Sequence, residues 1–178
     1  CACLVGSEMC IRDRENLLEE GRTVEFNAMF MDRYLWNLQF GPSGIVPKKR
    51  ASGTPIDGVI VSAGIPELDE AKALVASLQA DGLPYVGFKP GTVAQIRQVV
   101  AIAKAVAPTT ILMQVEGGSA GGHHSWESLD DLLTSTYAEV RACSNLVLVA
   151  GGGIGTPERA ADYILSLIHI SEPTRHAQ

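Results

Sequence analysis

The glycine-rich run at residues 114–126 (QVEGGSAGGHHSW) is the part of the chain best equipped for chemistry. It contains four glycines and the adjacent imidazoles of His123 and His124, and it directly follows the apolar run 111–113. An imidazole titrates near pH ~6.5, so it can give or take a proton at neutral pH. Glycine allows close backbone approach to a ligand, although it is also the ordinary residue of a turn. The run therefore predicts a ligand site at the end of a buried strand, with a plain turn as the alternative.

A second glycine-rich run, residues 149–158 (VAGGGIGTPE), leads from an apolar segment into the start of a helix. Thr156 is a favourable helix N-cap residue. Free backbone N–H groups and the positive end of a helix dipole attract anions. We predict a phosphate site here, with a glycine turn as the alternative; its residues are Gly151, Gly152 and Gly153.

Further polar residues stand at the ends of other apolar runs, namely Asn27, Ser62, Lys89 and Gln114. Lys89 could face an anionic group from such a position, and a solvated loop lysine is the alternative. Residues that could do chemistry thus follow several different predicted strands.

The elements that must position these residues alternate along the chain. Apolar runs of strand length occupy residues 23–30, 58–62, 85–88, 110–115 and 145–150. Apolar residues at helical spacing occupy 68–78, 93–103 and 129–140, and Thr92 and Thr156 are predicted N-caps. Continuous apolar strands that alternate with helices predict an α/β fold with a parallel sheet covered by helices.

Two architectures have this alternation, the open doubly wound sheet and the closed (β/α)₈ barrel. The run 41–44 (GPSG) does not supply the Gly-x-Gly-x-x-Gly of a dinucleotide-binding fold. Chemistry placed after several strands favours a TIM barrel. Since such a barrel has eight strands, the five predicted here imply an incomplete barrel that lacks about three β/α units.

Both ends of the chain differ from this patterned middle. Residues 7–14 (SEMCIRDR) and 165–173 (LSLIHISEP) can be written as translations of one DNA word and its reverse complement. This pairing resembles read-through of a sequencing adapter. We therefore expect residues 1–14 and 165–178 to be adapter-derived, residues 15–164 to be a partial domain, and the terminal cysteines and histidines to form no metal site.

The composition narrows the classes of partner. The formal net charge is −6, and no basic cluster appears beyond residues 48–50, which argues against a nucleic-acid surface. No apolar segment approaches the ~20 residues that span a bilayer, and the first ten residues lack the pattern of a signal peptide. We expect a cytoplasmic protein.

Four runs together resemble the enoyl reductase domain of microbial type I fatty acid synthases: residues 87–92 (GFKPGT), 95–96 (QI), 114–127 and 151–158. The likeness covers nearly all of residues 21–163 and is greatest to the long actinobacterial multienzymes. More distantly, the chain resembles flavin-dependent nitronate monooxygenases and stand-alone flavin enoyl reductases. The resemblance implies a (β/α)₈ barrel that binds FMN and takes electrons from NADPH.

The resemblance also implies roles for individual residues. His123 matches the active-site histidine, and His124 belongs to the synthase version of the motif. The residues that match cofactor-binding positions are Asn27, Lys89, Gln114, Gly151, Gly152 and Gly153. We expect Ser62, Gly117, Gly118 and Gly122 to bind the cofactor as well. Ser119 stands where the synthases are expected to have arginine. The turn expected after the eighth strand, which would complete the phosphate site, is absent from the chain.

The implied reaction is reduction of a 2,3-enoyl thioester on acyl carrier protein, within an oligomeric parent synthase that carries other domains. Hydride reaches the β-carbon from reduced flavin, and a proton reaches the α-carbon while negative charge builds on the thioester oxygen. An imidazole suits either protonation or stabilisation of that oxygen. Two alternatives stay open, a nitronate monooxygenase-like FMN oxidase and a truncated fragment with no activity of its own.

Overall fold

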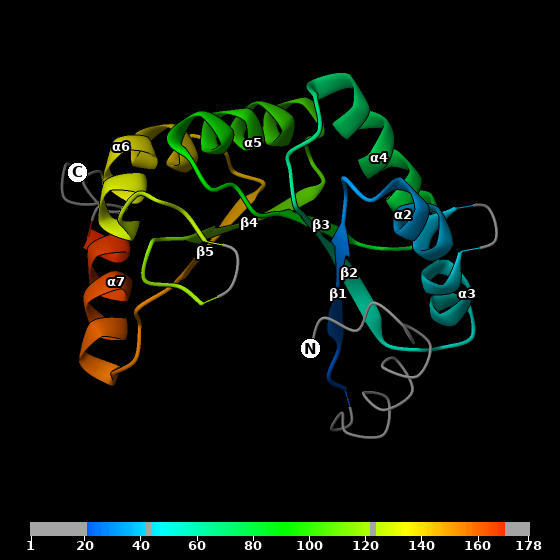
Figure 1. Ribbon diagram of the computed structural model, residues 1–178, viewed down its shortest axis with the longest axis horizontal. Helices are drawn as coiled ribbons and strands as arrows, with labels where there is room; N and C mark the ends of the chain where they lie inside the picture. Colours follow the sequence, from blue (N-terminus) through cyan, green and yellow to red (C-terminus); the bar gives the residue numbers. More distant parts are fainter. Residues whose placement is uncertain (1–20, 42–43, 122–123, 170–178) are drawn as a thin grey trace, which may run out of the picture.

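The computed structural model describes residues 21–41, 44–121 and 124–169. Strands and helices alternate along most of this range (Figure 1). The strands are β1 (Val24–Met29), β2 (Ile56–Ser62), β3 (Tyr85–Phe88), β4 (Thr110–Glu116) and β5 (Leu146–Gly151). The helices are α2 (Arg33–Phe40), α3 (Ile45–Ala51), α4 (Leu68–Ala80), α5 (Val93–Ala105), α6 (Leu129–Arg141) and α7 (Pro157–His169).

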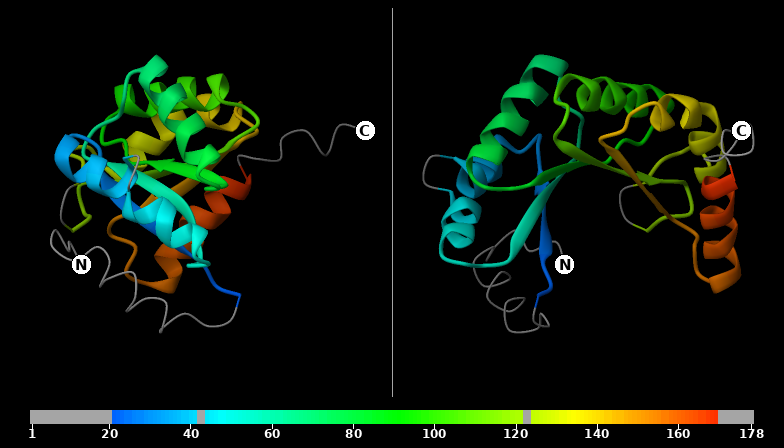
Figure 2. Two further views of the ribbon diagram at one scale, coloured as in Figure 1. Left: turned by 90° about the vertical axis from the view of Figure 1, so that its right-hand side faces the viewer. Right: turned by 180° about the vertical axis from the view of Figure 1, so that it is seen from behind.

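The five strands form one parallel sheet in the order β1-β2-β3-β4-β5, so each strand pairs with its neighbour in the chain. Helices α4, α5 and α6 lie along the outer side of the resulting arch, and in the views from the front and from behind no described helix covers its inner side (Figures 1 and 2). A doubly wound sheet instead reverses its strand order and carries helices on both faces. The α/β arrangement is thus observed, while closure into an eight-stranded barrel stays a prediction.

The core lies between the sheet and the outer helices. Ile111, Met113 and Val115 of β4 are fully buried on the helix-covered face, whereas the residues between them are only partly buried. Burial alternates along β4 and along most of β1 and β5, because the described helices cover one face of the sheet only.

Helix starts follow the predicted caps. Thr92 Oγ1 accepts a hydrogen bond from the Gln95 backbone N–H at 3.2 Å, and Thr156 Oγ1 accepts one from the Arg159 N–H at 3.2 Å. Helix α7 runs across the boundary predicted after residue 164, and the origin of the terminal segments stays a prediction. Within the described residues, no helix combines the length and apolar character needed to cross a bilayer.

The short helices α2 and α3 were not predicted. Asp32 caps α2 by accepting a hydrogen bond from the Leu35 N–H, but α3 has no side-chain cap. Helix α2 is held mainly by aromatic packing, in which Trp36 contacts both Phe30 and Phe40. These contacts connect α2 to the end of β1. The helix itself has only eight residues, too few to show a recognisable helical period in the sequence.

Candidate functional site

The open face of the sheet carries most of the polar residues that the sequence singled out. Side chains alternate between the two faces of a strand, and paired residues of parallel strands point to the same face. Asn27 pairs with Ile60, Ile60 with Gly87, and Gly87 with Leu112. Gln114 lies two residues beyond Leu112 and therefore shares that face. Gln114, and Ser62 and Lys89 two residues beyond Ile60 and Gly87, lie toward the carboxyl ends of their strands, at the carboxyl edge of the sheet.

Asn27 and Ser62 form the first polar group at this edge. Ser62 Oγ donates to Asn27 Oδ1 at 2.7 Å and also lies 3.1 Å from the Ala28 carbonyl oxygen. The bond links β1 to β2 across the open face. It brings together two residues whose pairing the sequence did not reveal.

A second polar group, the Lys89–Gln114–Glu116 cluster, links β3 to β4. Lys89 Nζ lies 3.1 Å from Glu116 Oε1, and Gln114 Nε2 donates to the same oxygen at 2.6 Å. The side chains of Lys89 and Glu116 are only 23% and 18% exposed. The prediction of Lys89 and Gln114 as site residues missed Glu116, although its position two residues after Gln114 puts it on the same strand face.

The loop after β4 lies on the glycine loop after β5. The Gly117 N–H donates to the Gly151 carbonyl at 3.2 Å, which extends the strand pairing by one step. Gly152 and Gly153 have positive φ angles of 98° and 74°. A Cβ atom on Gly152 would come within 2.9 Å of the Ala120 Cβ. Both glycines are therefore required by backbone conformation and by close approach.

The glycine loop also presents unused donors. Among the described residues, none accepts a hydrogen bond from the backbone N–H groups of residues 152–155. Thr156 then caps α7, whose first turn contributes the positive end of the helix dipole. Such an arrangement is able to bind an anion.

A pocket of about 290 Å³ adjoins this loop. It lies between the loops after β4 and β5 and the facing ends of α6 and α7, and its lining includes Ser119, Gly152, Gly153, Trp126, Arg159 and Tyr163. Lys89, Gln114 and Glu116 do not line it. The pocket therefore belongs to the glycine-loop half of the candidate site, and we regard the sheet edge as its other half because the polar strand-end residues gather there.

Helices α6 and α7 are joined at this pocket by Asp130, Arg159 and Tyr163. Tyr163 Oη donates to Asp130 Oδ1 at 2.8 Å, and Arg159 Nη2 lies 3.2 Å from Asp130 Oδ2. The hydrogen bond from Tyr163, assisted by Arg159, lowers the pKa of Asp130. Burial, followed by the Asp130 interaction, raises the pKa of Tyr163. The hydrogen bonds of Tyr163 and Arg159 to Asp130 connect α7 to the start of α6.

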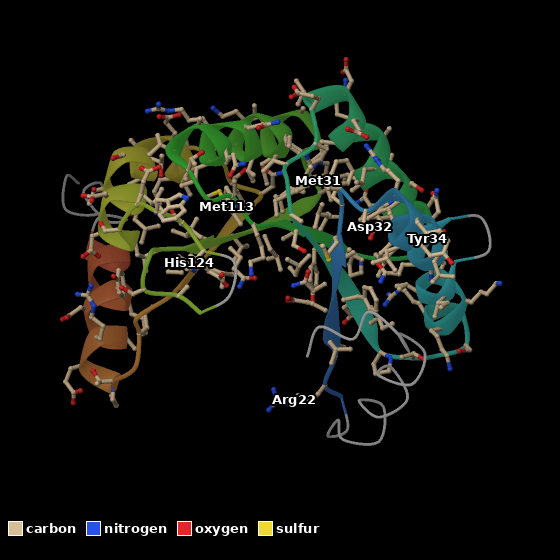
Figure 3. All side chains as sticks on the ribbon, viewed as in Figure 1. Arg22, Met31, Asp32, Tyr34, Met113 and His124 are labelled. Carbon is tan, nitrogen blue, oxygen red and sulfur yellow. The ribbon has the colours of Figure 1, made fainter. Side chains whose placement is uncertain are left out.

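Ser125 anchors the loop between β4 and α6, which we call the histidine loop because it contains the two histidines of the sequence motif. Ser125 is 3% exposed, its Oγ donates to the Gly91 carbonyl at 2.6 Å, and it accepts from the Glu127 N–H at 2.9 Å. His124 is exposed on this loop between β4 and α6 (Figure 3). The predicted residues Gly122 and His123 lie outside the described residues. Ser125 was missed because a serine after two histidines carries no sequence signal of burial.

The remaining predicted glycines have a packing role as well. Gly117 is buried, and a Cβ there would clash with the Leu129 backbone nitrogen at the start of α6. Gly118 donates its N–H to the Glu127 carbonyl at 2.9 Å and lines the pocket. Their predicted contacts with a cofactor stay predictions.

Most of the chain is similar in sequence to fungal fatty acid synthases. Residues 110–167 match a family model described as "Fatty acid synthase subunit beta/Fas1-like, helical". The chain is 41% identical over 138 residues to fatty acid synthase 2 of Mycosarcoma maydis, covering 78% of this chain and 4% of the relative. It is 42% identical over 114 residues to the beta subunit of Schizosaccharomyces pombe, covering 64% and 5%, and 33% identical over 147 residues to that of Saccharomyces cerevisiae, covering 83% and 7%.

These matches confirm the predicted likeness to fatty acid synthases, and the family model and two of the three relatives add that the similar part is in the beta subunit. The chain spans only 4% to 7% of the length of the three relatives. The matched relatives are fungal, and the narrower likeness to actinobacterial multienzymes stays a prediction. The family match also runs from β4 into α7 and so passes the boundary predicted after residue 164.

Proposed function

We propose that the chain is the enoyl reductase portion of a type I fatty acid synthase, in which 2,3-enoyl thioesters are reduced with electrons from NADPH through FMN. The observation that carries this proposal is the carboxyl edge of the sheet. There the Lys89–Gln114–Glu116 cluster lies one strand away from a glycine loop whose N–H groups at residues 152–155 have no acceptor among the described residues. Similarity to fatty acid synthases supports the biochemical setting.

The residues at this edge fit the chemical parts of FMN. The positive φ angles and unused N–H groups of the glycine loop suit the phosphate. The ammonium of Lys89 and the amide of Gln114 suit the polar edge of an isoalloxazine ring. Exposed apolar side chains on the open face, including Met29 and Val149, suit its flat apolar surface. The residues that would hold FMN are thus Lys89, Gln114 and the loop 151–153, with Asn27 and Ser62 beside them.

Bound FMN would supply the hydride chemistry of the reaction. The chain's own residues would position the reactants and handle the proton. Lys89 would place a positive charge near the electron-rich edge of the cofactor, and the glycine loop would fix the phosphate. His123 would give a proton to the substrate or stabilise its thioester oxygen, the role implied by its place in the glycine-rich motif.

The proposal includes the architecture and the setting of the segment. Sequential parallel strands, helices on the outer face and an open inner face support an incomplete (β/α)₈ barrel, about five of eight units. Further strands of a longer synthase would complete it. Acyl carrier protein would deliver the thioester in the cytoplasm, within an oligomeric multienzyme.

Purification of the full-length synthase that carries this segment tests the proposal. We expect a yellow protein with about one FMN per reductase domain, and NADPH consumption that depends on a crotonyl thioester. NADPH consumption that depends on oxygen and ignores the thioester would instead identify an FMN oxidase. A colourless protein whose NADPH consumption is unaffected by added FMN would overturn flavin chemistry at this site.

A further inference from the structure

We propose that Glu116 is a positioning residue, which holds the Lys89 ammonium and the Gln114 amide in fixed orientations beside the cofactor. This inference rests on the proposed function, because it concerns the side of the site that would face FMN. The sequence resemblance assigns no role to Glu116.

The geometry of one carboxylate oxygen carries the inference. Glu116 Oε1 lies 3.1 Å from Lys89 Nζ and accepts from Gln114 Nε2 at 2.6 Å. Two side chains from adjacent strands are therefore oriented by the same atom. Because Gln114 directs its NH₂ group at Glu116, its amide oxygen is left to accept a hydrogen bond elsewhere.

Lys89 keeps unused donors in this arrangement. An ammonium has three N–H groups, and Glu116 is its only ion-pair partner in the part of the chain that the structure describes. The remaining donors can therefore serve a ligand. Without Glu116, the flexible four-carbon side chain of Lys89 would no longer be held in one position.

The ion pair of Lys89 and Glu116 is less exposed than the surface ion pairs of the same chain, so its loss should affect the position of Lys89 more strongly. Arg97 and Glu139 also form a close ion pair at 2.8 Å, but their side chains are 54% and 41% exposed. Solvent screens such an exposed pair, and its contribution is commonly small. The less exposed Lys89 depends more strongly on its carboxylate.

The strand register explains why Glu116 can occupy this position. Glu116 pairs with Gly151 of β5, and a Cβ atom on Gly151 would lie 3.3 Å from Glu116 Cγ. The absence of a side chain at Gly151 thus leaves room for Glu116 at the boundary between the sheet edge and the glycine loop. Glu116 thereby joins the two halves of the candidate site.

A double-mutant cycle in the full-length synthase tests this role. The variants are Glu116→Ala, Lys89→Ala and the double substitution, each assayed for FMN content, kcat and KM with a crotonyl thioester. If Glu116 acts through Lys89, Glu116→Ala lowers kcat about 10-fold, and the double variant is no slower than Lys89→Ala. Multiplying effects, or a Glu116→Ala variant with unchanged kcat, would overturn the inference.

Two further variants separate positioning from folding and from the proposed function. Glu116→Gln retains an acceptor oxygen for Gln114 but lacks the charge, so it should recover less than half of the kcat that Glu116→Ala loses. Full recovery would rule out orientation of Lys89 by charge.

The control Glu139→Ala removes an exposed ion-pair glutamate and should leave kcat, KM and FMN content unchanged. If Lys89→Ala alters neither the flavin spectrum nor kcat, the placement of FMN fails; if it alters both and Glu116→Ala alters neither, only the role of Glu116 fails.

Discussion

Gly152 has a backbone conformation that a branched side chain rarely adopts, with φ at 98°, and a Cβ atom added to it would come within 2.9 Å of the Ala120 Cβ in the neighbouring loop. We predict that Gly152→Val in the full-length synthase displaces the loop and separates its N–H groups from the cofactor phosphate. Retention of FMN during gel filtration should fall by at least tenfold. Full retention would show that the loop is a turn with no role in binding.

A control substitution isolates the cause. Gly53 has almost the same φ, 97°, but a Cβ atom added there would have no neighbouring atom within 4 Å, and the residue is distant in sequence from the loop. Gly53→Val should lower stability without selective loss of FMN.

His123 is predicted to act on the substrate rather than to hold the flavin. In the full-length synthase, His123→Ala should lower enoyl reduction by ~10²-fold or more, the usual scale for a positioned acid or base, while bound FMN stays near stoichiometric. Flavin content and single-turnover rates measure the two effects separately. Loss of flavin with normal turnover of the flavin that remains would contradict this role.

At the scale of elements, sequence patterns predicted the alternating strands and helices but not the short helices α2 and α3. The run 85–88 coincides with β3, and the helical pattern from residue 129 coincides with the start of α6. Apolar period and cap residues carry this information locally. By contrast, α2 is held by aromatic contacts with residues around β1, and α3 is seven residues long with no side-chain cap. Such helices depend on tertiary contacts.

The candidate site likewise has a part that the sequence predicted and a part that it did not. Strand ends and glycine runs pointed to Lys89, Gln114 and the loop 151–153, because parallel strands bring their carboxyl ends to one edge. The hydrogen bond between Asn27 and Ser62 and the double contact of Glu116 depend on register and side-chain orientation. Neither can be obtained from spacing along one strand.

The histidine loop offers a test at this scale, because Ser125 fastens its end to the loop after β3. Ser125→Ala removes the hydrogen bond to the Gly91 carbonyl and leaves that group without its partner. We predict about a tenfold lower kcat, with FMN content unchanged. The exposed Ser52, whose Oγ donates to the Lys49 carbonyl, provides the control, and Ser52→Ala should leave kcat unchanged. An unchanged kcat in Ser125→Ala would show that loop anchoring does not affect catalysis.

At the scale of the whole molecule, the open face of the sheet exposes apolar side chains. Val147 and Val149 of β5 are 47% and 43% exposed, and Met29 of β1 is 41% exposed. In the described sheet, β1 and β5 each pair on one side only. Unpaired strand edges beside exposed apolar surface favour association with other chains.

We therefore predict that residues 1–178 expressed alone form soluble aggregates or precipitate. Gel filtration and thermal unfolding provide the measurements. Added FMN should bring little stabilisation, since stabilisation requires a native state that binds the ligand. A monomer that unfolds cooperatively and binds FMN with micromolar affinity would show that the segment is a complete domain and would contradict the incomplete barrel.

We propose above all that the carboxyl ends of β3, β4 and β5 form a site for flavin-dependent reduction of an enoyl thioester. The most direct measurement is an anaerobic single turnover of the full-length synthase, in which NADPH first bleaches the flavin absorbance and a crotonyl thioester is then added. We expect the absorbance to return in the absence of oxygen, in proportion to the butyryl thioester formed, and we expect Lys89→Ala to slow the return. A flavin that stays reduced until oxygen is admitted would contradict the proposal.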